Sequence, residues 1–376
     1  MSLSTTTIQE GLALAARVHK KYKPVWDGRE PSEAAALGLY FLPHRSAKLE
    51  LGPTRPRMIK WYCPFADQAE FPTGHRYCIN VFTGCEHNCE YCYAKAYEPG
   101  HASCKTHFTR SLRRDLEELE AYEVPAAPVH LSNSTDPFQR LEAESGQTRF
   151  ALEQILRYRR HFTSVVILTK NPGLAAKPEY LELLQMLNEL PAGHASRDIF
   201  AHQGLPGLRV EVSVAFWRED VRALLDPGAP SVEDRLNGIR LLRQAGIPVV
   251  LRIDPLFPRS PIDGKSLDDF QFPEAQPLED LDRLLAFAAE VGVMHVVYSP
   301  AKIVLPRPRA LSPLMRNLKR VYEQLAAPPN KLVFRGGSWR LPPEVANLHV
   351  VQPFLDLCRR HGLAAQFCKQ NLITTP

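Results

Sequence analysis

Residues 79–92 read INVFTGCEHNCEYC, an apolar run followed by a Thr-Gly breaker and three cysteines in C-x3-C-x2-C spacing. Three thiolates on one tight loop can hold three irons of a [4Fe-4S] cluster, whereas a structural cluster usually has four cysteine ligands. The fourth iron then stays open to chelate a small molecule and pass it an electron. We therefore predict a [4Fe-4S] cluster on Cys85, Cys89 and Cys92.

Zinc is the first alternative for these cysteines. A structural zinc site is tetrahedral and is typically built from paired C-x2-C units with a second Cys or His pair. The nearest fourth ligands are His87, His101 and Cys104, and no second C-x2-C pair follows. Zinc is therefore disfavoured, and a disulfide framework even more so, because eight cysteines in 376 residues are sparse.

The composition is that of a large globular protein, with 44% hydrophobic and 23% charged residues. No stretch approaches the about 18 consecutive apolar residues of a membrane span, and the N-terminus has no apolar signal-peptide core. We expect a cytoplasmic protein that does not enter membranes. The formal net charge of +5 permits a polyanionic partner without requiring one.

The pattern of the chain predicts three parts. Residues 1–75 form an N-terminal extension with a short helix at 5–21 and a proline-interrupted linker at 45–60. Residues 76–305 form the main domain. Residues 306–376 form a C-terminal extension or cap with two helical stretches.

Strand and helix patterns alternate from residue 79 onward. Strands are predicted at 79–83, 129–132, 164–169, 208–214, 248–253 and 295–298, and helices at 111–122, 147–161, 178–190, 232–245 and 278–291. The apolar runs at 165–168 and 249–251 are typical of parallel strands buried on both faces. Six strand–helix units predict an α/β fold with a partial (β/α)6 barrel, since a full (β/α)8 barrel needs about two more.

Polar residues follow most of these strands, where βα barrels carry their chemistry. They are Ser132 to Asp136, Thr169 to Asn171, Ser213, Arg252 to Asp254, and Tyr298 to Lys302. Each group alone is also a turn signal, because Ser, Asn, Asp and Pro favour turns for backbone reasons. Together, beside a metal loop, they predict a binding site.

The cysteine spacing, the Tyr93 that follows it and its place after a strand resemble the radical S-adenosylmethionine (radical SAM) superfamily. The resemblance implies a partial barrel, a [4Fe-4S] cluster, S-adenosylmethionine and an electron donor such as a flavodoxin or ferredoxin. It also implies an enzyme that cleaves S-adenosylmethionine reductively to a 5′-deoxyadenosyl radical, which abstracts hydrogen from a substrate.

The candidate cofactor-binding residues follow from what S-adenosylmethionine offers. Its carboxylate needs a cation, for which Lys170 and Arg252 are candidates. Its ribose needs short polar partners, and its adenine needs an apolar wall. The candidates for these two roles are Asn133, Ser134 and Ser213 for the ribose, and Tyr91 for the adenine. The alternatives are loop packing for Tyr91, a solvated lysine for Lys170, and an ion pair with Asp254 or another acid for Arg252.

Residues 77–171 look most like the spore photoproduct lyase family, and Lys170 and Ser213 also match its pattern. In that family a Cys-Thr-Ser-Asp stretch follows the second strand, and its cysteine donates a hydrogen atom to the product radical. Here the stretch reads Asn133-Ser134-Thr135-Asp136, and an amide does not donate a hydrogen atom readily. The resemblance therefore implies a lyase-like relative with another substrate. Cys104 is a weak candidate for a replacement donor, and a structural thiol is the alternative.

Nucleic acid is a candidate partner, because basic residues cluster in three places. These are 110–114, 157–160 around Tyr158, and 307–320. The first two clusters fall on helices that also carry acids, which is typical of solvated faces. The rival function is thus a non-catalytic nucleic-acid-binding protein whose cysteines hold zinc or a structural cluster. The other cysteines, at 63, 78, 104, 358 and 368, match no tight cluster motif and are expected to be packed thiols.

Overall fold

The computed structural model describes residues 58–60, 77–97, 101–121, 127–189, 207–306, 310–328, 330–335 and 337–368. The predicted helix at 5–21 and most of the linker at 45–60 lie outside these residues. One eight-stranded sheet dominates, in the order β1-β2-β5-β6-β7-β8-β9-β13. The seven strands from β2 to β13 are parallel, and β1 joins β2 antiparallel. The predicted α/β class with a parallel sheet is confirmed.

The strands divide into one main sheet and two small ones. The main sheet contains β1 (Ile59–Lys60), β2 (Tyr77–Ile79), β5 (Ala127–Leu131), β6 (Phe162–Thr169), β7 (Leu208–Ser213), β8 (Val249–Leu256), β9 (His295–Pro300) and β13 (Ala364–Phe367). The small sheets contain β3 (Phe82–Thr83) with β4 (Ser103–Cys104), and β10 (Ile303–Val304) with β12 (Ser338–Arg340) and β11 (Val333–Arg335). In the described chain, β1 and β13 are the two ends of the strand order, so the barrel is partial.

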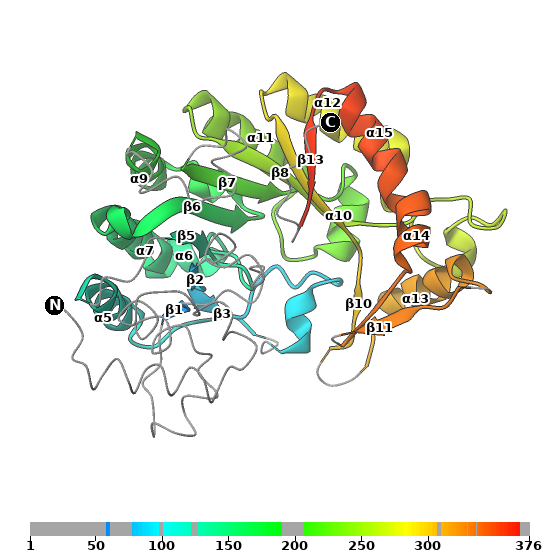
Figure 1. Ribbon diagram of the computed structural model, residues 1–376, viewed down its shortest axis with the longest axis horizontal. Helices are drawn as coiled ribbons and strands as arrows, with labels where there is room; N and C mark the ends of the chain where they lie inside the picture. Colours follow the sequence, from blue (N-terminus) through cyan, green and yellow to red (C-terminus); the bar gives the residue numbers. More distant parts are fainter. Residues whose placement is uncertain are drawn as a thin grey trace, which may run out of the picture.

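The larger helices cover the outer face of this curved sheet (Figure 1). The α-helices are α5 (Phe108–Ala121), α6 (Arg140–Ser145), α7 (Gln147–Arg157), α8 (Pro172–Ala175), α9 (Pro178–Glu189), α10 (Glu219–Leu225), α11 (Val232–Gln244), α12 (Leu278–Glu290), α13 (Pro313–Leu325), α14 (Pro343–Ala346) and α15 (Gln352–Arg360). Short 3-10 turns are η2 (Tyr93–Ala96), η3 (Arg159–His161) and η6 (Asp268–Phe270), and η7 (Asn347–Val351) is a π-helix. Of the helices described, none is both long and apolar enough to cross a bilayer.

Local capping chemistry explains where two of the long helices begin. Ser231 precedes α11 and its hydroxyl accepts a hydrogen bond from the Asp234 amide, and Ser312 caps α13 through the Met315 amide in the same way. Each cap satisfies an amide that has no partner within the helix. The observed bounds of five helices also lie within a few residues of the predicted ones. These helices are α5, α7, α9, α11 and α12.

Two predictions of the fold were wrong in detail. The single strand at 79–83 is two strands, because the chain leaves the main sheet after Ile79 and β3 then pairs antiparallel with β4. The segment 306–376, predicted as a helical cap, also supplies β13, which pairs parallel with β9. The division of the chain at 75 and 305 stays a prediction.

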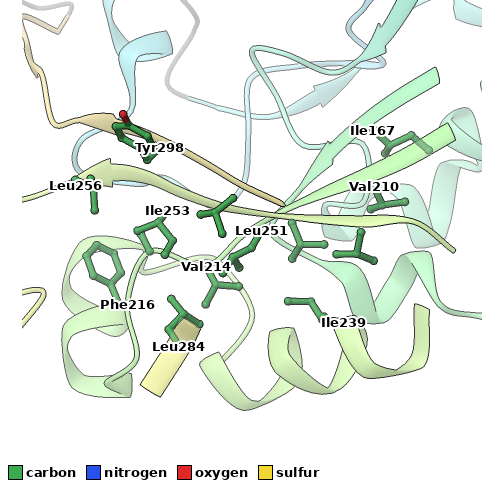
Figure 2. Packing of buried hydrophobic residues seen from close by; sticks show 14 of the residues in the cluster. Ile167, Val210, Val214, Phe216, Ile239, Leu251, Ile253, Leu256, Leu284 and Tyr298 are labelled. Carbon is green, nitrogen blue, oxygen red and sulfur yellow. The ribbon is translucent and has the colours of Figure 1, made fainter. Parts of the chain in front are cut away.

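The two faces of the main sheet differ in polarity. Its outer face is apolar: Val210 and Leu251 pack there against Ile239 of α11 (Figure 2). The opposite face of β7 and β8 carries Arg209, Glu211, Ser213, Arg252 and Asp254, because side chains alternate along a strand. The predicted apolar runs at 165–168 and 249–251 are buried apart from the half-buried Leu168, so burial on both faces is confirmed there. The inner face of β8 becomes polar only from Arg252 onward.

The outer layer is expected to account for much of the stability. Leu251→Ala should lower the free energy of unfolding by about 2–5 kcal/mol, because Leu251 is fully buried between β8 and the helices. Urea unfolding of the metal-free protein measures this loss. Leu241→Ala on α11, where the side chain is 42% exposed, is the control and should change stability by about 0.5 kcal/mol or less. A loss below about 1 kcal/mol for Leu251→Ala would contradict the assigned core.

Candidate functional site

The three predicted cluster cysteines lie on the loop between β3 and η2. The chain turns back through the hydrogen bond from the Cys92 amide to the Cys89 carbonyl, 3.2 Å. Gly84 starts the loop with a φ of +70°, and a Cβ there would lie 2.3 Å from the His101 carbonyl oxygen. Only glycine fits this approach, so the predicted breaker sets the entry of the cysteine loop.

Side chains from the end of β5 hold the cysteine loop. His87 Nε2 lies 2.9 Å from Asp136 Oδ2, and both side chains are buried. The Glu86 amide donates to Gln139 Oε1 at 2.7 Å, and Glu86 Oε2 accepts from the Leu141 amide at 2.9 Å. These contacts fix the loop to the segment that follows β5.

Asp136 also ties the loop to the end of β6. Its carboxylate accepts hydrogen bonds from the Thr169 hydroxyl at 2.7 Å and the Lys170 amide at 2.6 Å. Burial alone would raise the pKa of Asp136, but His87 and these hydrogen bonds lower it below its usual value. Asp136 is thus an ionised junction of three chain segments.

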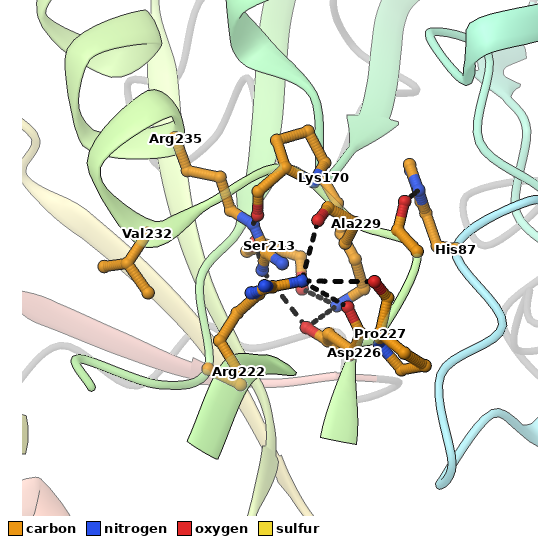
Figure 3. Close-up of polar contacts among 12 residues, drawn as sticks. His87, Lys170, Ser213, Arg222, Asp226, Pro227, Ala229, Val232 and Arg235 are labelled. Carbon is orange, nitrogen blue, oxygen red and sulfur yellow. Dashed lines mark hydrogen bonds and ion pairs between the residues drawn. The ribbon is translucent and has the colours of Figure 1, made fainter. Parts of the chain in front are cut away.

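Lys170 and Ser213, both predicted cofactor-binding residues, lie side by side at the ends of β6 and β7 (Figure 3). Lys170 Nζ donates to Ser213 Oγ and to the Tyr91 hydroxyl, each at 2.9 Å. It also lies 3.4 Å from Asp226 Oδ2. The Lys170 side chain is 13% exposed, and its ammonium contacts three protein groups.

Both the ring and the hydroxyl of Tyr91 make contacts. Its ring lies 6.1 Å from the Phe216 ring and 5.8 Å from the Phe257 ring, in edge contacts. Its hydroxyl donates to Asp226. These contacts favour the packing alternative for Tyr91, and its role beside adenine stays a prediction.

Asn133 and Ser134 lie just after β5, near the cysteine loop. Asn133 Nδ2 contacts Cys78 Sγ at 3.4 Å, and its Oδ1 lies 3.2 Å from His130 Nδ1. Ser134 Oγ lies 2.9 Å from the Tyr97 hydroxyl. Asn133 thus contacts side chains of β2 and β5, whereas Ser134 contacts the exposed Tyr97, and the predicted ribose contacts of both stay predictions.

Arg252 lies among carboxylates. It donates to Glu211 at 2.5 Å and to Asp254 at 2.7 Å, and its Nη2 lies 3.0 Å from Cys368 Sγ. Asp254 also accepts from the Ser299 hydroxyl at 2.5 Å. The ion-pair alternative for Arg252 is therefore present, and a ligand carboxylate would have to compete with two acids. Its role toward S-adenosylmethionine stays a prediction.

The remaining cysteines are dispersed. Cys104 is exposed on β4, opposite Phe82, and Cys358 is buried on α15. Cys63 lies outside the described residues. The burial of Cys358 fits the prediction of a packed thiol. The exposure of Cys104 does not fit a buried structural thiol.

The chemistry of the cysteine loop fits an iron–sulfur cluster better than a single zinc ion. In the described chain, no three His, Cys, Asp or Glu side chains converge on one point that could hold one metal ion. Cluster thiolates each bind a different iron and need not converge. His87, a candidate fourth zinc ligand, has both ring nitrogens in contact, with Asp136 and with the Gly228 carbonyl. Burial raises the pKa of all three thiols.

Several residues of the basic clusters are engaged by other side chains in the described part of the chain. Arg113 stacks on Phe150 between α5 and α7, and Arg160 pairs with Glu120 on the outer surface. Lys319 of α13 pairs with Glu323 and lies over Trp339, while 307–309 lie outside the described residues. Nucleic-acid binding through these clusters stays a prediction.

Sequence reasoning missed several residues of this site. Asp226 and Arg235 are both fully buried and pair at 3.1 Å, and Asp226 also lies 3.4 Å from Lys170. Glu211 pairs with Arg252. Asp226 sits in a Leu-Asp-Pro-Gly turn, which reads only as a turn signal. The alternation of Arg209, Glu211 and Ser213 along β7, and of Arg252 and Asp254 along β8, could have revealed a polar inner face.

Known proteins resemble the chain over this region. Residues 79–264 match the family model described as radical SAM superfamily. An uncharacterized protein of Mycobacterium bovis is 26% identical over 206 residues, which are 51% of this chain and 53% of the relative. An uncharacterized protein of Methanocaldococcus jannaschii is 21% identical over 185 residues, 49% of this chain and 62% of the relative. The match thus spans little more than half the length of either relative. A solved structure of a spore photoproduct lyase mutant has a TM-score of 0.49 at 15% identity and covers 95% of both chains.

Proposed function

The chain belongs to the radical SAM superfamily through residues 79–264, and we propose that it reductively cleaves S-adenosylmethionine at a [4Fe-4S] cluster. Cys85, Cys89 and Cys92 would hold the cluster. The observation that carries the proposal is the hydrogen bond from Lys170, at the end of β6, to the Tyr91 hydroxyl of this loop, while the same ammonium donates to Ser213 at the end of β7. A metal loop and a fixed cation thus meet at the carboxyl edge of a parallel sheet.

The protein's own residues prepare the site, while the cofactors supply the reaction. When bound, the cluster and S-adenosylmethionine supply a 5′-deoxyadenosyl radical that abstracts hydrogen from a substrate. His87 and Asp136 fix the cysteine loop, and Tyr91 shields its inner side with Phe216 and Phe257. Lys170 presents a positive charge suited to the carboxylate of S-adenosylmethionine.

We propose a lyase-like relative that acts on a substrate other than a thymine photoproduct. The support is Asn133, which occupies the position of the donor cysteine in the family that the sequence resembles. We also propose an electron donor such as a flavodoxin or ferredoxin as a partner, since the cluster must be reduced before it can react.

Anaerobic reconstitution tests the proposal. The wild-type chain is expected to bind about four irons. With a reductant and S-adenosylmethionine it should form 5′-deoxyadenosine, measured by liquid chromatography. The matched control is the same protein without reductant, which should form none.

The rival function gives a different result. A nucleic-acid-binding protein with a structural metal would hold stoichiometric zinc, or a cluster whose EPR spectrum does not change when S-adenosylmethionine is added. No 5′-deoxyadenosine from a fully reconstituted and reduced sample would overturn the proposed function.

A further inference from the structure

The turn between α10 and α11, residues 225–229, lies directly against the cysteine loop. The Glu90 amide donates to the Leu225 carbonyl at 2.8 Å, and the Gly228 amide donates to the His87 carbonyl at 3.0 Å. His87 Nδ1 also lies 3.3 Å from the Gly228 carbonyl oxygen. Two segments separated by about 140 residues in sequence therefore share a backbone ladder. We call residues 225–229 the brace.

The approach of the brace to the cysteine loop requires glycine. A Cβ at Gly228 would lie 2.1 Å from the Glu86 carbonyl oxygen and 3.0 Å from His87 Cα. Both neighbours are backbone atoms of the cysteine loop, so a larger residue could be accepted only if that loop moved.

Two arginines hold the brace in this conformation (Figure 3). Arg222 Nη1 donates to the carbonyl oxygens of Asp226 and Ala229 at 3.0 Å, and to that of Pro227 at 3.3 Å. Arg235 is fully buried and donates to Asp226 Oδ2 at 3.1 Å. Burying a guanidinium is costly unless it is paired. The pairing of Arg235 with Asp226 therefore favours this one conformation of the brace.

The Asp226 carboxylate connects the brace to Tyr91 and Lys170. One oxygen accepts from the Tyr91 hydroxyl, and the other faces both Arg235 and, at 3.4 Å, Lys170 Nζ. Its charge is therefore shared between a buried structural arginine and the cation that faces the cysteine loop.

We propose that the brace positions the site at two levels: Gly228 seats the cysteine loop, and Asp226 is a positioning residue that orients Lys170 and Tyr91 for S-adenosylmethionine. This inference rests on the proposed function. It predicts that Gly228 mainly affects retention of the cluster, and that Asp226, whose carboxylate also hydrogen-bonds to Cys89, mainly affects affinity for S-adenosylmethionine.

The first test uses Asp226→Asn, which keeps the shape of the side chain and removes its charge. Iron per chain after reconstitution should match wild type. The S-adenosylmethionine concentration that gives half of the change in the EPR spectrum of the reduced cluster should rise about tenfold or more, as for loss of a charged hydrogen bond. Asp282→Asn, on the outer surface of α12 and 38% exposed, is the matched control and should leave that concentration unchanged.

Tyr91→Phe keeps the test decisive if Asp226→Asn fails to fold. It removes only the hydroxyl that joins Lys170 to Asp226 and keeps the ring contacts with Phe216 and Phe257. Iron should again be retained, with a severalfold higher half-saturating S-adenosylmethionine concentration. An unchanged concentration in either folded variant would overturn the role of Asp226.

The second test concerns Gly228. Gly228→Ala should retain less iron and lose it to a chelator at least about tenfold faster than Gly173→Ala, whose Cβ would meet only Asn171 Oδ1 at 3.7 Å. Equal rates in the two variants would overturn the seating role. A wild-type sample that binds iron but gives no spectral response to S-adenosylmethionine would instead overturn the proposed function, because the wild type is measured beside every variant.

Discussion

Replacing Cys85, Cys89 and Cys92 together by alanine should remove all of the iron bound after reconstitution, about four atoms per chain, and all 5′-deoxyadenosine formation. The three thiols come from one loop whose backbone is fixed by Gly84, Asp136 and Gln139 through contacts that do not involve sulfur. The apoprotein should therefore keep its fold. Iron analysis, liquid chromatography and circular dichroism of the same samples check the three statements.

The matched control removes two other thiols, in Cys104→Ala/Cys358→Ala. Cys104 is exposed on β4 and Cys358 is buried on α15, and neither lies on the cysteine loop. This variant should bind as much iron as wild type and form 5′-deoxyadenosine. Iron retained by the triple variant, or lost from the control, would show that the ligands have been assigned incorrectly.

The sequence was sufficient for features that are encoded locally. The cysteine spacing and the Thr83-Gly84 breaker are contiguous, so their prediction needed no tertiary information. The strand at Phe162–Thr169 and the helix at Val232–Gln244 likewise have strong periodicity and clear ends, and both were predicted to within a few residues.

The partners of the site could not be predicted, because they are brought together only by the fold. Asp226 lies 135 residues from Tyr91, whose hydroxyl it binds, in a turn with no distinctive motif. Gly228 reads as an ordinary turn glycine until the cysteine loop is seen against it. β13 is a short strand that gains its stability from pairing with β9, so its four residues gave no signal of their own.

Glu211→Gln should lower the free energy of unfolding by about 3–5 kcal/mol at neutral pH, because it removes one member of a buried ion cluster and leaves the others uncompensated. Glu211 accepts from Arg252 at 2.5 Å and from the fully buried Arg209 at 3.1 Å. Urea unfolding of the metal-free protein measures the loss. Glu323→Gln, which breaks an exposed pair with Lys319 on α13, is the control and should cost about 0.5 kcal/mol or less.

The pH dependence distinguishes an ion cluster from simple loss of packing. Burial alone would raise the pKa of Glu211, but Arg252 and Arg209 lower it from 4.5 to about 2. The unfolded chain therefore takes up the proton first as the pH falls, and the stabilisation from the ionised carboxylate is complete above pH 4.5 and is lost toward pH 2. The difference in unfolding free energy between wild type and Glu211→Gln should thus be constant from pH 7 to about 5 and shrink at lower pH. A difference that stays constant down to pH 3 would mean that Glu211 stabilises the barrel by its shape and not by its charge.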